Sequence, residues 1–245
     1  MIKYEFPLNE RIRKFMRVEE IFIKIDLLTT SKANYTEFSL FERLFELMLT
    51  ASRSDLKVDL IQEIERQKVK LKSKSKTQAN NNLMVRLAKI KNALEKAKVQ
   101  PGFYFGNDKF LQEIKSRRDS PYGITSVDFP EFDYWLQNES SLVRKEYFKQ
   151  KIGPFNPIKD AIFVILAILR SNAKKELVVA SEGSFQKKLD PTLKNDFITV
   201  SMNLRSNYYP IVSSNKYAVS IRFEHYIKHN SLDKNMKLKI GIGSL

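Results

Sequence analysis

The chain has 245 residues, and 42% of them are apolar, which is enough to build the core of one large domain or two smaller ones. Lys and Arg number 43 against 28 Asp and Glu, so the formal charge is +15, which favours anionic partners such as acidic peptides, nucleic acid or anionic lipid. No cysteine is present, and this excludes disulfides, thiolate nucleophiles, zinc fingers and iron–sulfur clusters.

The amino-terminal residues predict a strand followed by a long helix. Residues 2–6 alternate as a strand does, and a helix is expected over about residues 9–28, because Asn9 is a good capping residue. Glu19 falls within the apolar face of this helix. It is therefore either buried with a hydrogen-bonding or cationic partner, or at the solvent edge of that face.

Three cations share another face of the same predicted helix. Arg13, Arg17 and Lys24 align because positions i, i+4 and i+11 come together at 3.6 residues per turn. Arginine is suited to bidentate recognition of carboxylates, so this face is a candidate for binding an acidic partner. The alternative is an ordinary solvated helix face.

Apolar residues at helical spacing predict further helices up to about residue 170. The polar stretch Lys72–Asn82 is expected to be an exposed loop, so that the helices on either side form a hairpin with a basic tip, Lys68–Lys76. The most apolar helix is expected to be the central core helix. The predicted helices cover about residues 36–50, 54–71 and 83–98, a short one capped by Asn107 or Asp108, one from Pro130, and one from Asn156-Pro157 to Arg170.

Beyond about residue 175 the pattern becomes β-branched or aromatic and partly alternating. We expect strands at 177–180, 197–204, 208–212, 217–223 and 236–242, with a short candidate at 124–128. The predicted fold is α+β: a mainly helical domain, residues 7–172, packed with an antiparallel β domain made of residues 1–6 and 173–245.

The targeting signals point to a cytoplasmic chain. The amino terminus lacks the pattern of a signal peptide. The longest apolar run, Ala161–Leu169, is about half of the ~20 residues that a membrane span needs. No membrane insertion is therefore expected.

No pattern points to catalysis, a cofactor or a metal. The seven glycines form no phosphate-binding loop, and Gly241-Ile-Gly243 is expected to be a terminal turn. His225 and His229 lie four apart on a predicted extended segment without a nearby third ligand, so they make a poor metal site. We expect neither an enzyme nor a cofactor.

Several short stretches form a signature that extends over nearly the whole chain. They are Tyr4-Glu-Phe-Pro-Leu-Asn-Glu10 with Arg13, Arg17 and Glu19; Glu63-Ile-Glu-Arg-Gln67 with Leu71; Ser126-Val-Asp-Phe-Pro130 with Trp135-Leu136; Asn156-Pro157 with Leu169-Arg170; Asn203-Leu204; Tyr209-Pro210; and Ile221-Arg222-Phe223. In this order and register they resemble the ZapD family of Z-ring-associated cell-division proteins, which bind the tubulin-like FtsZ. Residues 72–82 and the tail after His225 match least.

The resemblance implies a cytoplasmic homodimer without catalytic activity, located at the mid-cell division ring. Its partner would be the carboxy-terminal tail of FtsZ, held at a basic pocket, and the dimer would cross-link and bundle FtsZ filaments to stabilise the Z ring. Carried over by position, the candidate tail-binding residues are Arg13, Arg17, Arg53, Lys109, Arg117 and Arg222.

At three places this chain does not match the family's expected tail-binding residues fully. Arg53 is placed by a looser match, and Lys109 stands where relatives carry an arginine, so the charge is kept but the bidentate fork is lost. Lys216-Tyr217-Ala218 departs from a family pattern that often has arginine there. The alternative function is a basic nucleic-acid-binding protein without catalytic activity, although no recognised reading module is evident.

Overall fold

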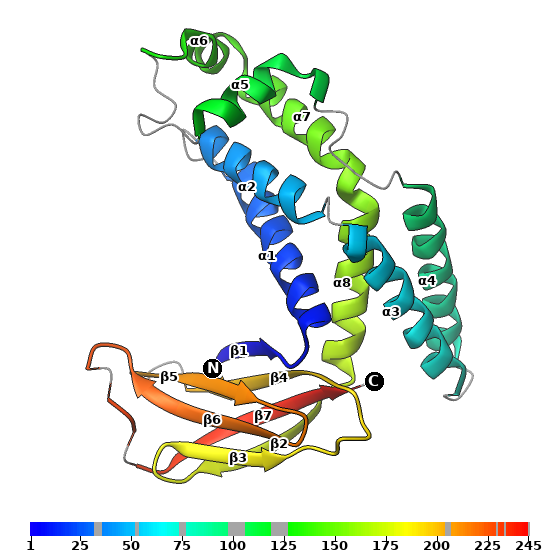
Figure 1. The fold of residues 1–245 in the computed structure, drawn as a ribbon, viewed down its shortest axis with the longest axis vertical. Coiled ribbons are helices and arrows are strands. Elements are labelled where there is room, and N and C mark those ends of the chain that lie inside the picture. The colour runs from blue at the N-terminus through cyan, green and yellow to red at the C-terminus, as the bar shows by residue number, and fades with distance from the viewer. Residues whose placement is uncertain are drawn as a thin grey trace. The chain divides into compact units, whose positions relative to one another are not determined.

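The computed structural model describes residues 1–31, 36–51, 54–73, 77–97, 106–118, 127–203, 207–228, 230–232 and 234–244. The chain divides into two compact units, the first made of Met1–Met16 with Val164–Leu245 and the second of Arg17–Phe163. The first unit holds the strands and the second is helical, which confirms the α+β fold (Figure 1). The domain boundaries predicted after residues 6 and 172 stay a prediction.

Eight helices are present in the described part of the chain, and α1 and α8 contribute residues to both units. A single 3-10 turn, Gly153–Phe155, joins the last two. The helices are α1 (Glu10–Thr30), α2 (Thr36–Ala51), α3 (Ser54–Ser73), α4 (Gln78–Lys96), α5 (Lys109–Arg118), α6 (Pro130–Asn138), α7 (Ser141–Ile152) and α8 (Asn156–Ser171).

An aromatic cluster fills the core of the helical unit around Phe41 of α2. Phe41 is fully buried, and the centroid of its ring lies 4.7 Å from that of Phe148. The rings of five further residues from α2, α5, α6 and α7 have centroids within 6.3 Å of Phe41: Phe45, Phe110, Phe132, Trp135 and Tyr147. Burying so much aromatic surface at one point holds these four helices together.

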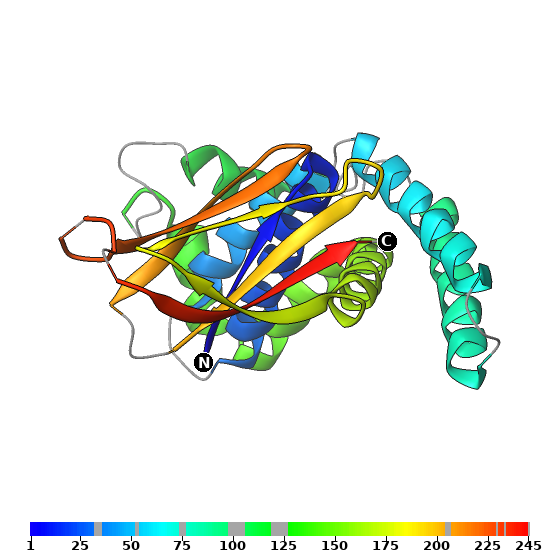
Figure 2. The ribbon, with the colours of Figure 1, turned by 90° about the horizontal axis from the view of Figure 1, so that it is seen from below.

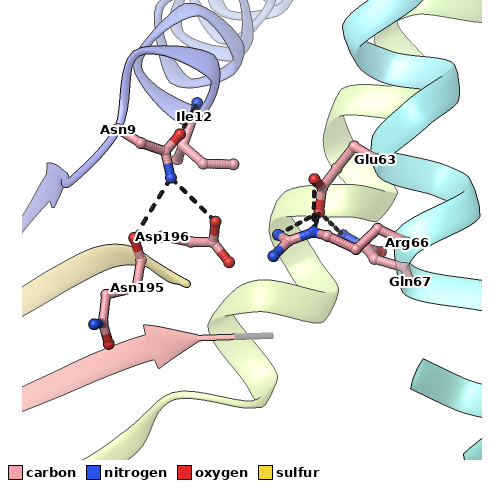
Figure 3. Close-up of polar contacts among 7 residues, drawn as sticks. All are labelled: Asn9, Ile12, Glu63, Arg66, Gln67, Asn195 and Asp196. Atoms are coloured by element: carbon pink, nitrogen blue, oxygen red, sulfur yellow. Dashed lines mark hydrogen bonds and ion pairs between the residues drawn. The ribbon is translucent and has the colours of Figure 1, made fainter. Parts of the chain in front are cut away.

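The buried carboxylate of Glu63 in the helical unit is hydrogen-bonded, whereas two other buried side-chain atoms, Oε1 of Gln67 and Nε of Arg117, have no hydrogen-bond partner among the described residues. Glu63 of α3 is fully buried and accepts hydrogen bonds from Nη2 of Arg66 at 2.7 Å and from Nε2 of Gln67 at 3.2 Å (Figure 3). Such pairing is required because a buried carboxylate without partners is costly. Glu19 is also buried, with 6% of its surface exposed, so the buried interpretation of this residue is correct and the solvent-edge interpretation is wrong.

The hairpin of α3 and α4 forms as predicted, but its polar turn is shorter than predicted. Helix α3 continues to Ser73, and α4 begins at Gln78, capped by Thr77, whose hydroxyl accepts the Asn80 N–H at 3.2 Å. The exposed loop predicted over residues 72–82 is therefore wrong at both of its described ends. Capping and the Gln78–Asn82 side-chain bond, at 3.1 Å, support an exposed helical turn without any burial.

One other expectation for the helical unit fails, and one helix is missing from the prediction. Val127 and Asp128 form a turn, so the strand predicted over residues 124–128 is wrong there, and its first three residues lie outside the described residues. Helix α7 was not predicted at all. Only Phe148 among its residues is fully buried, so the sequence has no clear apolar pattern at helical spacing that would predict this helix.

One helical stretch, Ser141–Ser171, is long and apolar enough to cross a membrane by length and composition alone. It joins α7, the 3-10 turn and α8, and half of its apolar window is buried. Half of the α8 residues are buried, as predicted for a core helix: Ile158, Ala161, Ile162, Val164, Ile165, Leu166, Ile168 and Leu169. A buried core helix passes the same test, so this stretch is weak evidence for a span.

The first unit is a sandwich of two antiparallel sheets. The larger sheet has the strand order β1-β4-β7-β2 and the smaller has the order β3-β6-β5 (Figures 1 and 2). The strands are β1 (Ile2–Pro7), β2 (Lys174–Ala180), β3 (Ser184–Lys188), β4 (Asn195–Met202), β5 (Tyr208–Ser214), β6 (Ala218–His225) and β7 (Met236–Ser244). All the predicted strands of this region are present. Strand β3 was missed, because Phe185 is its only apolar residue.

The core of the sandwich lies between the two sheets. Its buried members include Ile198 and Val200 of β4, Ile221 and Phe223 of β6 and Ile240 of β7. Alternate residues of each strand therefore face inward and the others outward.

Two glycines of β7 allow close packing inside the larger sheet. A Cβ on Gly241 would lie 2.6 Å from Oγ1 of Thr199, and one on Gly243 would overlap the ring of Phe197. Both residues belong to a strand, so the terminal turn predicted for Gly241-Ile-Gly243 is wrong. No side chain larger than hydrogen fits at these positions without a shift of the neighbours.

Hydrogen bonds tie the start of α1 to β4. The side-chain oxygen of Asn9 accepts the Ile12 N–H at 3.0 Å and so caps the helix, while its amide nitrogen donates to Oδ1 of Asp196 at 3.1 Å (Figure 3). The predicted capping role of Asn9 is confirmed. This residue therefore serves the fold rather than a ligand.

A charge pair joins β1 to the end of α8. Nη2 of Arg170 donates to Oε2 of Glu5 at 2.7 Å, and Lys3 also bonds this carboxylate. Burial raises the pKa of Glu5, but the bonds from Arg170 and Lys3 outweigh it, so the pKa lies below its ordinary value of 4.5. The pair consequently favours the ionised form of Glu5 in the folded state.

This charge pair makes stability depend on acid pH. Because the folded pKa of Glu5 is depressed, its contribution is full above about pH 4.5 and is lost as the pH falls through the folded pKa. We expect Glu5→Gln to lower the free energy of unfolding by about 2 kcal/mol at pH 7. Urea unfolding at several pH values between 7 and 3 measures the free energy of unfolding of both proteins. The difference in this free energy between Glu5→Gln and the wild type should shrink below about pH 4.5.

The exposed pair Lys149–Glu146 supplies the control. Glu146→Gln should change stability by less than about 0.5 kcal/mol at either pH, because exposed ion pairs contribute little. A Glu5→Gln difference that stays constant over the whole pH range would contradict the prediction.

Candidate functional site

A depression of about 350 Å³ lies between α1 and α2 of the helical unit. It is lined by Arg17, Glu20, Ile21 and Lys24 of α1 and by Glu46, Leu49 and Thr50 of α2. The structure thus brings two cations of the predicted basic face, Arg17 and Lys24, to one hollow. We call it the α1–α2 depression.

Arg17 is the cation of this depression that is available to a ligand. Its side chain is exposed and forms no hydrogen bond or ion pair with any described residue. The other charges are paired, Lys24 with Glu20 at 2.7 Å and Glu46 with Arg43. An exposed guanidinium beside neutralised neighbours is suited to a carboxylate, which it can bind with two parallel hydrogen bonds.

The depression also has an apolar wall that the sequence analysis missed. Leu49, which lines the depression, is 74% exposed; Phe38, eleven residues earlier on α2 and outside the lining, is 43% exposed. Eleven residues make three helical turns, so both lie along the same edge of α2, outside the core-facing stripe. An apolar residue off the stripe of an amphipathic helix is the signal that could have revealed this edge.

Arg117 is used by the fold. It donates to the Asp128 carbonyl at 2.6 Å, pairs with Glu113 at 3.3 Å and lies 4.8 Å from the ring centroid of Phe129. A side chain held by three partners is poorly suited to bind a ligand as well. Lys109, the first residue of α5, is exposed and has no partner among the described residues.

Two other described site residues, Arg13 and Arg222, do not line the α1–α2 depression. Arg13 lies one turn before Arg17 on α1 and pairs with Glu10 at 3.3 Å across exposed side chains, a contact that a ligand could displace. Arg53 lies outside the described residues. Arg222 belongs to the β unit, where it is exposed on the outward face of β6 and has no described partner.

The described cations of the α3–α4 hairpin are partly neutralised. Glu65 bonds both Lys68 at 3.1 Å and Lys91 at 2.9 Å, and these bonds lower the pKa of its carboxyl. Lys57 donates to the carbonyls of Glu95 and Ala97. The hairpin therefore offers less free positive charge than its composition indicates.

The β unit carries a second depression, of about 420 Å³. Its lining includes Leu8, Leu189 and Leu193 together with Lys194 and Lys216. The two lysines have no partner in the described part of the chain. Lys216 is the first residue of the segment Lys216-Tyr217-Ala218, where a departure from the family pattern is expected.

Metal binding finds no support in the described residues. No group of three or more His, Asp or Glu side chains that could hold a metal is found among them. His229 lies outside the described residues, and Nδ1 of His225 accepts the backbone N–H groups of Ile227 and Lys228, both at 3.2 Å. The absence of catalysis stays a prediction.

Comparison with known proteins decides the family. A family model described as the cell division protein ZapD matches residues 16–222. The chain belongs to the ZapD family. Two similar relatives are cell division proteins ZapD of Azoarcus sp. (strain BH72), 32% identical over 91% of this chain and 90% of theirs, and of Aromatoleum aromaticum (strain DSM 19018 / LMG 30748 / EbN1), 30% identical over 100% and 98%.

The ZapD signature divides into residues that serve the fold and residues that remain available. Glu5 pairs with Arg170, Asn9 caps α1, and Glu63 bonds Arg66 and Gln67. Arg17 and Arg222 are exposed and have no partner among the described residues. These two arginines are therefore the signature cations that folding leaves free.

Proposed function

We propose that this protein acts in cell division by binding the carboxy-terminal tail of FtsZ at the α1–α2 depression. The observation that carries the proposal is Arg17: a signature arginine, exposed beside Leu49 and without a described partner. A peptide that offers a carboxylate next to an apolar side chain complements this pair of groups. Arg13, one turn earlier on α1, and Lys24 are the next candidates to contact the peptide.

The proposed mechanism is physical and involves no chemical step. A filament displays one tail on each FtsZ subunit, so it is a row of identical ligands. A two-fold dimer of this chain would carry two equivalent sites and could hold tails from two filaments. Many weak contacts then add through effective concentration, and the filaments bundle in the cytoplasm at the division ring.

A filament sedimentation experiment tests the proposal. Low-speed pelleting of FtsZ polymers should increase when this protein is added, and the increase should weaken as salt rises above about 0.1 M, where the screening length is about 10 Å. Polymers of FtsZ without the carboxy-terminal tail are the control and should not pellet. Equal pelleting with and without the tail would contradict the proposal.

A further inference from the structure

The outward face of the larger sheet carries an unusual combination of side chains on β2 and β7. Lys175, Leu177 and Val179 of β2 alternate with the core residues Val178 and Ala180, so they point away from the sandwich core. Leu177 lies opposite Lys239 of β7, and Val179 lies opposite Lys237. We call these five residues the β2–β7 face: Lys175, Leu177, Val179, Lys237 and Lys239.

The apolar residues of this face protrude into solvent. Leu177 is 83% exposed and Val179 is 47% exposed, although both belong to a regular strand. The three lysines around them have no hydrogen-bond or ion-pair partner in the part of the chain that the structure describes. Exposed apolar side chains surrounded by unpaired cations mark an interaction surface for an anionic partner.

The edge of β2 is poorly suited to receive an added strand. Among the described strands, β2 has a ladder partner on one side only, β7. Glu176 alternates with Leu177, so it points to the core side of the sheet, where it pairs with Lys187 of β3. Inward-pointing charges on an edge strand are a common protection against strand addition.

A second copy of the chain also fits this face poorly. A two-fold contact would place the same patch against itself, so lysines from one copy would meet lysines from the other. Like charges brought together in this way oppose association. The charge of the face favours a negative surface instead.

We propose that the β2–β7 face docks on an anionic phospholipid surface. Leu177 and Val179 would enter the interfacial region, and the stems of Lys175, Lys237 and Lys239 would reach the phosphate groups, as long basic side chains do beside apolar ones. A side chain that is 83% exposed stands out from the sheet and is suited to a flat partner, whereas a peptide groove would partly enclose it. This inference does not depend on the proposed binding of FtsZ.

Vesicle flotation tests the proposal with the full chain. The protein should float with vesicles of 30% phosphatidylglycerol in phosphatidylcholine and remain unbound with pure phosphatidylcholine, at about 0.1 M salt. Each lysine should contribute about fivefold in affinity, so Lys237→Glu combined with Lys239→Glu should weaken binding at least tenfold. Leu177→Gln should weaken it severalfold without changing the net charge.

The control has the same change of charge at another place. Lys145 of α7 and Lys188 of β3 are exposed and have no described partner, so Lys145→Glu with Lys188→Glu should lose at most about twofold. Circular dichroism and thermal melting should show that every variant is folded. An equal loss of vesicle binding in the two double variants would overturn the proposal, because it would show that binding depends on the net charge of the protein and not on the β2–β7 face.

Two further measurements distinguish this face from other interfaces. Light scattering after size exclusion should give Leu177→Gln the same mass as the wild type, and a smaller mass would overturn the proposal by assigning the face to self-association. The Lys237→Glu, Lys239→Glu variant should bind the FtsZ tail peptide as the wild type does. A loss of peptide binding with vesicle binding intact would overturn the lipid assignment and leave the proposed function standing.

Discussion

Arg17→Glu should weaken binding of the FtsZ tail peptide by at least tenfold. The substitution removes the unpaired guanidinium of the α1–α2 depression and places a carboxylate there. Hydrogen bonds to charged groups contribute about 1.5–3 kcal/mol, which corresponds to roughly 10- to 100-fold in affinity. Fluorescence anisotropy of a labelled tail peptide at fixed salt measures the dissociation constant.

Two variants make the Arg17 experiment specific. Arg17→Lys keeps the charge and loses the bidentate geometry, so it should retain part of the affinity. Lys145→Glu reverses an exposed charge on α7, away from the lining of the depression, and should change the affinity by less than about twofold. If Lys145→Glu weakened binding as much as Arg17→Glu, attraction would come from net charge, and the site assignment would be wrong.

Phe41→Ala should lower the free energy of unfolding by about 4 kcal/mol. The ring is fully buried and contacts six other aromatic rings from four helices, so its removal leaves a cavity that several helices would have to move to fill. For a chain of this size the midpoint of thermal unfolding should fall by roughly 10 °C. Differential scanning calorimetry measures both quantities.

Phe38→Ala on the same helix is the matched control. Phe38 is 43% exposed, so removing its ring should cost no more than about 1 kcal/mol. Comparable losses for the two variants would show that the core of the helical unit is not centred on Phe41.

Strongly patterned elements could be predicted from the sequence, and weakly patterned ones could not. Helices α2 and α8 carry many apolar residues at helical spacing, so their positions follow from local periodicity. Helix α7 buries only Phe148 completely, and β3 has one apolar residue. Their structure depends on neighbours that come from distant parts of the chain, α2 for α7 and β6 for β3.

The two glycines of β7 explain why the predicted terminal turn is wrong. A Gly-Ile-Gly sequence is typical of a turn, yet Gly241 and Gly243 lie in a strand because Thr199 and Phe197 occupy the space where side chains would be. The residues responsible lie about 40 positions earlier, paired with the glycines across β4 and β7. Sequence reasoning sees the glycine but not the ring that excludes a side chain.

The candidate site could be predicted only in part for a similar reason. The helical spacing of Arg13, Arg17 and Lys24 predicts one basic face of α1, and two of these cations, Arg17 and Lys24, line the α1–α2 depression. The spacing could not show that Arg117 is held by the Asp128 carbonyl and the Phe129 ring, or that Leu49 lies beside Arg17. Which charges remain free is decided by tertiary contacts.

The position of β7 has a consequence for synthesis on the ribosome. β7 lies between β4 and β2 in the larger sheet, yet it comes after both of them in the chain. While residues 236–244 are still unmade, β2 has no ladder partner, and one edge of β4 is open. The nascent chain must therefore hold exposed strand edges until this segment emerges, a period in which chaperones would reduce aggregation.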